Sequence, residues 1–322
     1  MAGSRRSDPA ASVTCEVCHN RVDSAVHREP GRTTRSTILL PSVGPPASVV
    51  ERPGDWDNPR VPTVPRILVT NDDGYAAEGI RTLVDALGSL GEVWMVAPAS
   101  EQSGASHALT LERPLRVRQL GERRFAVDGT PTDCVALALS HQLRDLEPAL
   151  VVSGINAGPN MGADVHYSGT VSAAFEGVIL GLPAIAVSQV MSNGPRFEHA
   201  ARFTTELAAW VLETGMPPDT LLNVNVPAGE PRGVRLTCLG VRRYTEGVIE
   251  DRDPRGRQIF WIGGGSPVWE RIPGTDFHEV AAGWISVTPL HLDLTGFDFL
   301  TELRGDRPPW AAPSDDHVVS AG

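Results

Sequence analysis

The sequence predicts an α/β fold in which a doubly wound, mostly parallel sheet carries helices on both faces. Short apolar runs of three or four residues alternate along the chain with longer stretches of helical apolar spacing. The runs show no polar alternation, which is typical of strands that are buried on both faces. Polar or turn-forming residues follow each of the runs at 67–69, 93–96 and 150–152, as expected where strands end at a ligand-binding edge.

Composition and charge narrow the range of functions. The chain has 322 residues, of which 41% are hydrophobic, enough for one large core or two modest ones. It contains no lysine, which excludes P-loop NTPases, pyridoxal phosphate enzymes and protein kinases, because each needs a lysine at its site. The net charge of −11 argues against binding to a nucleic-acid duplex, whereas a small anion held by a metal ion remains compatible with it.

The chain is expected to be soluble, cytoplasmic and not associated with a membrane. Its four cysteines are too few and too scattered for a disulfide framework, which favours a reducing compartment. No apolar run approaches the roughly 18 to 20 residues that span a bilayer. The N-terminus also lacks an apolar segment of signal-peptide type.

Residues 1–64 are rich in Pro, Ser, Arg and Gly, which predicts a disordered extension. A start-site artefact is the alternative, because Val61 and Val64 lie just before the first strand and valine codons can serve as bacterial starts. N-terminal sequencing of native protein distinguishes the two. Between Cys15 and His19 the chain matches the Cys-x-x-Cys-His pattern of haem attachment or a partial zinc site. Without an export signal or a second cysteine pair, a chance match is the better interpretation.

The first predicted element is a strand at 66–70, whose apolar residues end in the turn-forming stretch 71–74. Residues 79–90 place apolar side chains at helical spacing, and 93–96 form a second strand, so these segments predict a βαβ unit. Residues 109–127 then alternate apolar and polar side chains around a glycine, which predicts an inserted hairpin and a mixed sheet. The elements expected next are a helix at 133–143, a strand at 150–152, a helix at 171–180 and a strand at 184–187.

Residues 222–300 are predicted to form a β-rich extension used for contacts between subunits. This part of the chain is rich in Pro and Gly. Its strand-like segments are 222–226, 235–239, 258–262 and 284–287. Residues 301–322 are expected to be a disordered tail.

Oxygen-bearing side chains gather in three of the predicted loops. Asp72 and Asp73 follow the first strand, residues 100–103 follow the second, and residues 153–156 follow a later one. Such residues suit a hard divalent cation. Asn-Asp-Asp-Gly is also an ordinary turn and helix cap, so the tetrapeptide alone decides little. Adjacent ionised carboxylates repel one another, however, and the convergence of three loops on one sheet edge favours a metal site.

A candidate anion site precedes the helix expected at 171–180. Ser168, Gly169 and Thr170 lie at its start, where free N–H groups and the helix dipole attract phosphate. The alternative is that Ser168 or Thr170 is only an N-cap, which is the more common role of an isolated Ser-Gly-Thr. His107 and His166 are further candidates for a general acid or a phosphate contact, although most such histidines are solvated or structural.

Several motifs resemble the SurE-type survival protein nucleotidases, which are metal-dependent 5'/3'-nucleotidases. The motifs, in chain order, are RILVTNDDGYAAEGI at 66–80, APASEQSGASHALT at 97–110, VDGTPTDCVALAL at 127–139, LVVSGINAGPNMGADVHYSGTVSAAFEGVILGLPAIAVS at 150–188 and GWISVTPLHLDLT at 283–295. The resemblance covers about 66–295. The extension at 1–64 is not part of the family pattern, and the segment 263–269 does not align, which leaves substrate preference open.

The resemblance implies a Rossmann-like α/β domain at 65–300 whose β-rich extension is exchanged between subunits, giving a homodimer or homotetramer. It also implies one divalent metal ion per subunit, Mg²⁺ or Mn²⁺. The implied ligands are Asp72, Asp73, Ser103 and Asn156.

The expected reaction is hydrolysis of nucleoside 5'- and 3'-monophosphates, with a water on the metal as nucleophile. The phosphate is expected to contact Ser168, Gly169, Thr170 and Asn160. Asp72, Asn156 and Ser168 are the expected catalytic residues, and Asp72 is the one expected to orient the water. A haloacid-dehalogenase-type phosphatase is less consistent, because adjacent aspartates break its Asp-x-Asp spacing. A non-catalytic nucleotide sensor on the same scaffold is the remaining alternative.

Overall fold

The computed structural model describes residues 64–191, 197–243, 248–262 and 268–306. Apart from Val64, the predicted N-terminal extension lies outside these residues, and so does its Cys15 to His19 pattern. Within the described ranges, no helix is long and apolar enough to cross a membrane.

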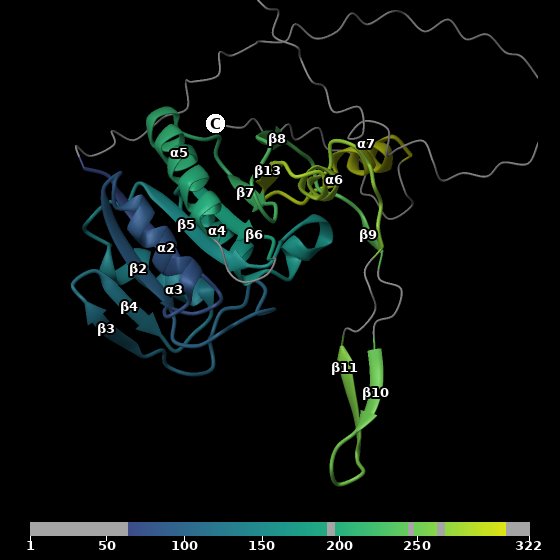
Figure 1. Cartoon of the computed structure of the whole chain (residues 1–322), viewed down its shortest axis with the longest axis horizontal. Coiled ribbons are helices and arrows are strands. Elements are labelled where there is room, and N and C mark those ends of the chain that lie inside the picture. The colour runs from purple at the N-terminus through teal and green to yellow at the C-terminus, as the bar shows by residue number, and fades with distance from the viewer. Residues whose placement is uncertain (1–63, 192–196, 244–247, 263–267, 307–322) are drawn as a thin grey trace, which may run out of the picture.

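A nine-stranded sheet forms the centre of the molecule (Figure 1). Its strands, in spatial order, are β3 (Val117–Gly121), β4 (Arg124–Val127), β2 (Glu92–Pro98), β1 (Arg66–Thr70), β5 (Leu150–Ala157), β6 (Ala184–Gln189), β7 (Thr220–Val226), β13 (Ile285–His291) and β8 (Val234–Leu236). The strands from β4 to β7 are parallel, while β3 pairs antiparallel with β4 and β13 pairs antiparallel with β7. The predicted mixed, mostly parallel α/β sheet with an inserted hairpin is therefore confirmed.

Helices cover both faces of this sheet. The two on one face are α2 (Glu78–Leu87) and α5 (Glu198–Thr214), and those on the other are α3 (Pro131–Leu137), continued by the π-helical turn η2 (Ala138–Gln142), and α4 (Gly169–Ile179). Alternate residues of β1 divide between the two cores, because successive side chains of a strand point to opposite faces. Ile67 and Val69 pack with α2 and α5, and Leu68 packs with α3 and α4.

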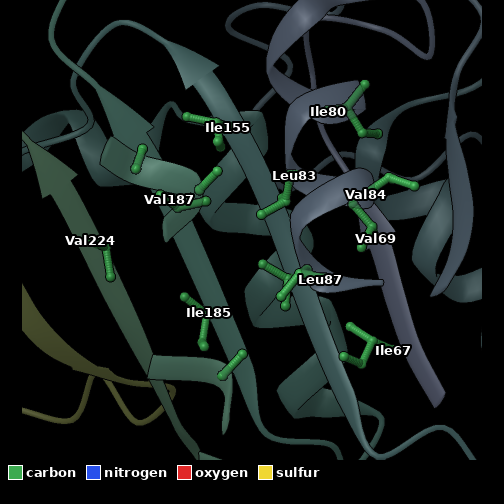
Figure 2. Close-up of a cluster of buried hydrophobic side chains, with 14 of the residues drawn as sticks. Ile67, Val69, Ile80, Leu83, Val84, Leu87, Ile155, Ile185, Val187 and Val224 are labelled. Carbon is green, nitrogen blue, oxygen red and sulfur yellow. The ribbon is translucent and has the colours of Figure 1, made fainter. Parts of the chain in front are cut away.

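Aliphatic side chains fill the core between α2 and the sheet (Figure 2). Ile80, Leu83 and Leu87 of α2 are fully buried, as are Ile67 of β1 and Ile185 of β6. Replacing one such leucine with alanine typically costs about 2–5 kcal/mol, because it leaves a cavity as well as losing apolar burial. This packing fixes the strands whose ends carry the candidate site.

The start of α2 lies directly against the end of β5. A Cβ atom added at Gly79 would lie 2.0 Å from the carbonyl oxygen of Ile155, so only glycine fits at this position. The close approach places the turn after β1 beside the last residues of β5.

Two elements differ from those the sequence predicts. Ser153–Asn156 lie within β5 and not in a loop, because Ser153 pairs with Ala186 and Asn156 with Ser188 of β6. Pairing with a neighbouring strand satisfies the backbone groups, which outweighs the turn-like composition of this segment. Helix α5 was not predicted, although its buried residues recur at helical spacing.

Only part of the predicted β-rich extension lies outside the main sheet. β7, β13 and β8 complete the main sheet, so a boundary at residue 222 falls inside β7. The elements outside the sheet are β9 (Arg242–Arg243) paired with β12 (Val268–Trp269), the hairpin of β10 (Val248–Arg252) and β11 (Gln258–Ile262), α6 (Asp276–Ala281) and α7 (Phe297–Asp306). The hairpin projects away from the sheet (Figure 1). The tail was predicted to start at residue 301, but residues 301–306 belong to α7. The helix has already begun before this point, because the Leu300 N–H donates an i, i+4 hydrogen bond to the Gly296 carbonyl oxygen.

Candidate metal and phosphate site

The candidate site lies where the strand order reverses. From β1 the chain first adds β2 and β4 on one side of the sheet, and it later adds β5, β6 and β7 on the other side. The switch point therefore lies between β1 and β5. Asp72 and Asp73 follow the C-terminal end of β1, and Asn156 is the second-last residue of β5. The Ala157 N–H donates to Asp73 Oδ2 at 3.1 Å, which joins the two strand ends directly.

Asp72 is held against the start of α4. Its side chain is buried, and the Thr170 hydroxyl donates to its Oδ1 atom. A Cβ atom added at Gly169 would lie 2.8 Å from the Asp72 Cβ and 3.0 Å from its Oδ2. The first turn of α4 therefore packs on this carboxylate, and glycine at 169 permits the contact.

The two carboxyl groups lie in an environment that resists ionisation. Burial raises the pKa of Asp72 from 3.8 to about 6, with the Thr170 hydroxyl opposing the shift and the neighbouring Asp73 adding to it. Burial also raises the pKa of Asp73; the Ala157 N–H opposes that shift, and repulsion from Glu101 adds to it. No positively charged side chain of the described residues contributes to either shift.

The loop after β2 reaches the site through its backbone. The Gln102 N–H donates to the Asp72 carbonyl oxygen at 2.8 Å. Ser103, the next residue, is exposed, and its hydroxyl donates to Glu101 Oε1 at 2.9 Å. The predicted serine ligand thus lies one residue from a direct contact with Asp72, beside a third carboxylate.

Oxygen donors converge at this point in a set that fits a hard divalent cation. The Asn156 Nδ2 group donates to the Gly158 carbonyl oxygen at 2.8 Å, which leaves the side-chain oxygen of Asn156 without a hydrogen bond from any described residue. A cation would relieve the repulsion among Asp72, Asp73 and Glu101. The described residues contain no group of three or more His, Cys, Asp or Glu side chains that could hold a metal ion. Ser103 and Asn156 remain, with the two aspartates, the predicted ligands.

The predicted phosphate contacts at α4 have more specific roles in the structure. Ser168 is the N-cap, since its Oγ accepts from the Val171 N–H at 3.1 Å, as the simpler interpretation of the motif held. Thr170 is fully buried and bonds to Asp72. No described residue accepts a hydrogen bond from the Gly169 N–H, so this group at the start of α4 remains available to an anion.

Asn160 is a structural residue of this loop. It is buried, and its side chain donates to Ser188 Oγ at 2.9 Å. Its backbone N–H donates to Asn225 Oδ1 at 2.8 Å, and its carbonyl oxygen accepts from Asn223 and Asn225. These bonds fasten the loop to β6 and β7, and the predicted contact of Asn160 with phosphate stays a prediction.

Of the two candidate histidines, His107 contacts α4 and His166 is the last residue of the short 3₁₀-helix before it. His107 Nε2 lies 2.9 Å from Glu176 Oε2, and Ser106 donates to the His166 carbonyl oxygen at 2.7 Å. Glu176 is six residues beyond Thr170, or about 9 Å along the helix. The Glu176 contact therefore holds His107 away from the Asp72 contact.

Comparison with known proteins decides the family. The family described as "Survival protein SurE" matches residues 67–246 of this chain. The 5'-nucleotidase SurE of Myxococcus xanthus is 52% identical over 242 residues, covering 74% of this chain and 92% of the relative. The chain belongs to the SurE family.

Other SurE proteins agree with this assignment. The 5'-nucleotidase SurE of Geotalea daltonii is 50% identical over 243 residues, covering 74% of this chain and 98% of its own length. The crystal structure of the SurE protein from Aquifex aeolicus matches with a TM-score of 0.68 and 44% identity, over 76% of this chain and all of that one. The resemblance seen in the sequence motifs and the predicted fold are both confirmed.

The sequence did not single out the residues that hold the SurE site in place. Asn223 and Asn225 of β7 act through contacts with residues far away along the chain. One signal was present, because two asparagines at alternate positions in the otherwise apolar strand LLNVNV are expected to be hydrogen-bonded when buried.

Proposed function

We propose that this chain is a metal-dependent phosphomonoesterase that hydrolyses nucleoside 5'- and 3'-monophosphates to nucleoside and phosphate. The observation that carries the proposal is the contact between Asp72 and the first turn of α4, which joins a carboxylate pair to an anion-attracting helix start. Relatives about half identical to this chain bear the name 5'-nucleotidase.

The proposed cofactor is one divalent ion per subunit, Mg²⁺ or Mn²⁺, held by Asp72, Asp73, Ser103 and Asn156. When bound, such an ion polarises the phosphoryl group and makes a water nucleophilic near neutral pH. Two fixed donors, the Thr170 hydroxyl and the Ala157 N–H, orient the aspartates that would hold it. Asp72 is the group proposed to orient or deprotonate the attacking water.

The substrate phosphate is proposed to lie between this carboxylate pair and the start of α4. The Gly169 N–H and the helix dipole would stabilise negative charge that develops on the phosphoryl oxygens. Ser168 contributes as the cap that fixes this turn. Asp72 and Asp73 are adjacent, which disfavours an aspartyl-nucleophile mechanism with Asp-x-Asp spacing.

The test is phosphate release from a panel of 5'- and 3'-nucleoside monophosphates and p-nitrophenyl phosphate. Each substrate is assayed with Mn²⁺, with Mg²⁺ and with chelator, and with Asp73→Asn beside the wild type. Metal-dependent turnover that is lost in the variant supports the proposal. Well-folded protein that binds nucleotide in calorimetry but releases no phosphate with either metal would instead be a sensor.

The same protein is proposed to form a homodimer or homotetramer through its β10–β11 hairpin. Isolated two-stranded hairpins are marginally stable in water. This one exposes 60% of Trp261 and 95% of Ile262, and Phe260 of the same strand is also exposed. A second copy of the chain would cover this apolar surface.

A further inference from the structure

The segment between β5 and α4 is fastened by residues from a distant part of the chain. It runs from Asn160 through the short 3₁₀-helix η3 (Gly162–His166) to Ser168. The Gly162 N–H donates to Asp276 Oδ2 at 2.8 Å, and Asp164 forms an ion pair with Arg242. Both partners belong to the part of the chain from which the β10–β11 hairpin projects.

Asp276 is the centre of this attachment. It is fully buried, and its second oxygen accepts from the Gly240 N–H and the Phe277 N–H, each at 2.8 Å. One carboxylate therefore joins η3, the loop between β8 and β9, and the start of α6. Hydrogen bonds from N–H groups to a charged acceptor are among the stronger ones in proteins. Here they oppose the effect of burial on the carboxyl but do not outweigh it, so the pKa of Asp276 is raised.

Two glycines allow these segments to approach. Gly162 has φ +54°, and a Cβ atom there would lie 2.7 Å from the Gly240 carbonyl oxygen. A Cβ atom at Gly240 would lie 2.9 Å from Asp276 Oδ1. Next to them, Met161 packs with Phe277 and Trp269, and Arg242 stacks over the Trp269 ring. The segment is held by both polar bonds and apolar contact.

The attachment continues to the start of α4. The Asp164 carbonyl oxygen accepts from the Ser168 N–H at 3.1 Å and from the Tyr167 N–H at 3.0 Å. The side chain of Asp164 is held by Arg242, and its backbone holds the N-cap of α4. A shift of η3 would thus move the helix start that packs on Asp72.

We infer that Asp276 is a positioning residue for phosphate binding. It fixes η3 to the loop before β9 and to the start of α6, and so sets where the first turn of α4 presents its N–H groups. The inference rests on the proposed function, because it names what holds the proposed phosphate site. Asp276 is buried and does not touch substrate. Its hydrogen bonds go to Gly162, Gly240 and Phe277 and to none of the proposed metal ligands, so its loss is expected to weaken phosphate binding more than metal binding.

The test uses Asp276→Asn, which keeps the side-chain size but replaces one acceptor oxygen with an NH₂ group. Calorimetry measures the Kd of Mn²⁺ alone and then the Kd of inorganic phosphate for the Mn²⁺-loaded protein. The expected result is phosphate binding weakened about tenfold or more, with Mn²⁺ binding changed less than about twofold. KM for nucleotide should rise in parallel with the phosphate Kd.

Glu279→Gln is the matched control. Glu279 lies in the same helix and accepts a backbone N–H, that of Gly274 at 3.0 Å, but this bond does not reach η3. Its phosphate Kd should equal that of the wild type. Asp164→Asn, which breaks the pair with Arg242, provides the result if Asp276→Asn fails to fold, and it should also weaken phosphate binding selectively.

The inference is overturned if the folded variants lose thermal stability but bind phosphate as the wild type does. It is equally overturned if Mn²⁺ and phosphate binding fall together, since that would indicate general loosening. A wild-type protein that binds Mn²⁺ but turns over no nucleotide would contradict the proposed function, and phosphate binding would still report on Asp276.

Discussion

Asp72 links the carboxylate pair after β1 to the start of α4. Its carboxylate follows β1 beside Asp73, and the same group accepts a hydrogen bond from Thr170 of α4. Burial raises its pKa to about 6, which is only about one unit below neutral pH, so without a cation a minor fraction of Asp72 is protonated there. The hydroxyl of Thr170 is the main group that lowers this pKa.

Thr170→Val is predicted to raise the pKa of Asp72 further, because it removes that hydroxyl while keeping the side-chain shape. The acidic limb of the kcat/KM profile for a nucleoside monophosphate should move about one pH unit upward. Thr204→Val is the control, since Thr204 is buried in α5 and its hydroxyl has no partner among the described residues. An unshifted profile in Thr170→Val would contradict the assigned contact.

The raised pKa of Asp72 also predicts how metal stabilises the fold. Without metal, a folded-state pKa of about 6 against 3.8 favours folding at low pH, and this contribution is lost as the pH rises through about 6. Metal binding needs the ionised carboxylate, so its affinity should fall about tenfold per pH unit below 6. Differential scanning fluorimetry should show a Mn²⁺-induced rise in Tm at pH 7.5 that is clearly smaller near pH 5. An equal rise at both values would exclude Asp72 as a ligand.

At the scale of residues, the sequence pointed to candidate metal ligands but not to the residues that hold them in place. Asp72 and Asp73 were evident because two carboxylates directly follow an apolar run. The bond from Thr170 joins residues 98 positions apart, and local patterns carry no information on such a pairing. For the same reason the bonds from Asn160 to β7 could not be predicted from the sequence.

At the scale of elements, the site depends on how α4 meets β1. The helix has a polar start and an apolar body, and its first glycine lies against Asp72. The helix and strands were predictable from apolar spacing. The length of β5 was not, because its pairing with β6 overrides the turn-like residues Ser153–Asn156.

Gly169→Ala is predicted to separate α4 from Asp72. The added methyl group would lie 2.8 Å from the Asp72 Cβ, which is closer than packed carbon atoms allow, so the helix or the carboxylate must shift. Phosphate release should fall by about 100-fold or more, given the sensitivity of catalysis to displacements near 1 Å. Gly296→Ala is the control, because a Cβ atom there meets nothing within 4 Å. Wild-type activity in Gly169→Ala would show that the two elements need not touch.

At the scale of the molecule, the sheet and the C-terminal extension form a single connected system. Residues beyond 220 supply three strands of the main sheet, the β10–β11 hairpin and the anchor at Asp276. The sequence predicted that this part is rich in strands. It did not predict which strands join the main sheet and which form the hairpin, because strands on a sheet edge and strands of a free hairpin have similar composition.

Replacing Trp261 and Ile262 together with serine is predicted to lower the oligomeric mass. Both side chains are exposed on β11, and burying them would be a main gain of association. Light scattering after size exclusion should give a dimer or tetramer for the wild type and a smaller species for the variant. Leu236→Ser serves as the control, since Leu236 is 82% exposed but lies on β8. A monomeric wild type would contradict this use of the hairpin.

The most direct test of the metal-dependent mechanism is a Mn²⁺ titration of chelator-treated protein, with bound Mn²⁺ and phosphate release from a nucleoside monophosphate measured on the same samples. One Mn²⁺ per subunit is expected, with activity rising in proportion to occupancy. Asp73→Asn should lose both together while keeping its fold by circular dichroism. Full activity in metal-free protein, or activity that does not follow Mn²⁺ occupancy, would contradict the proposal.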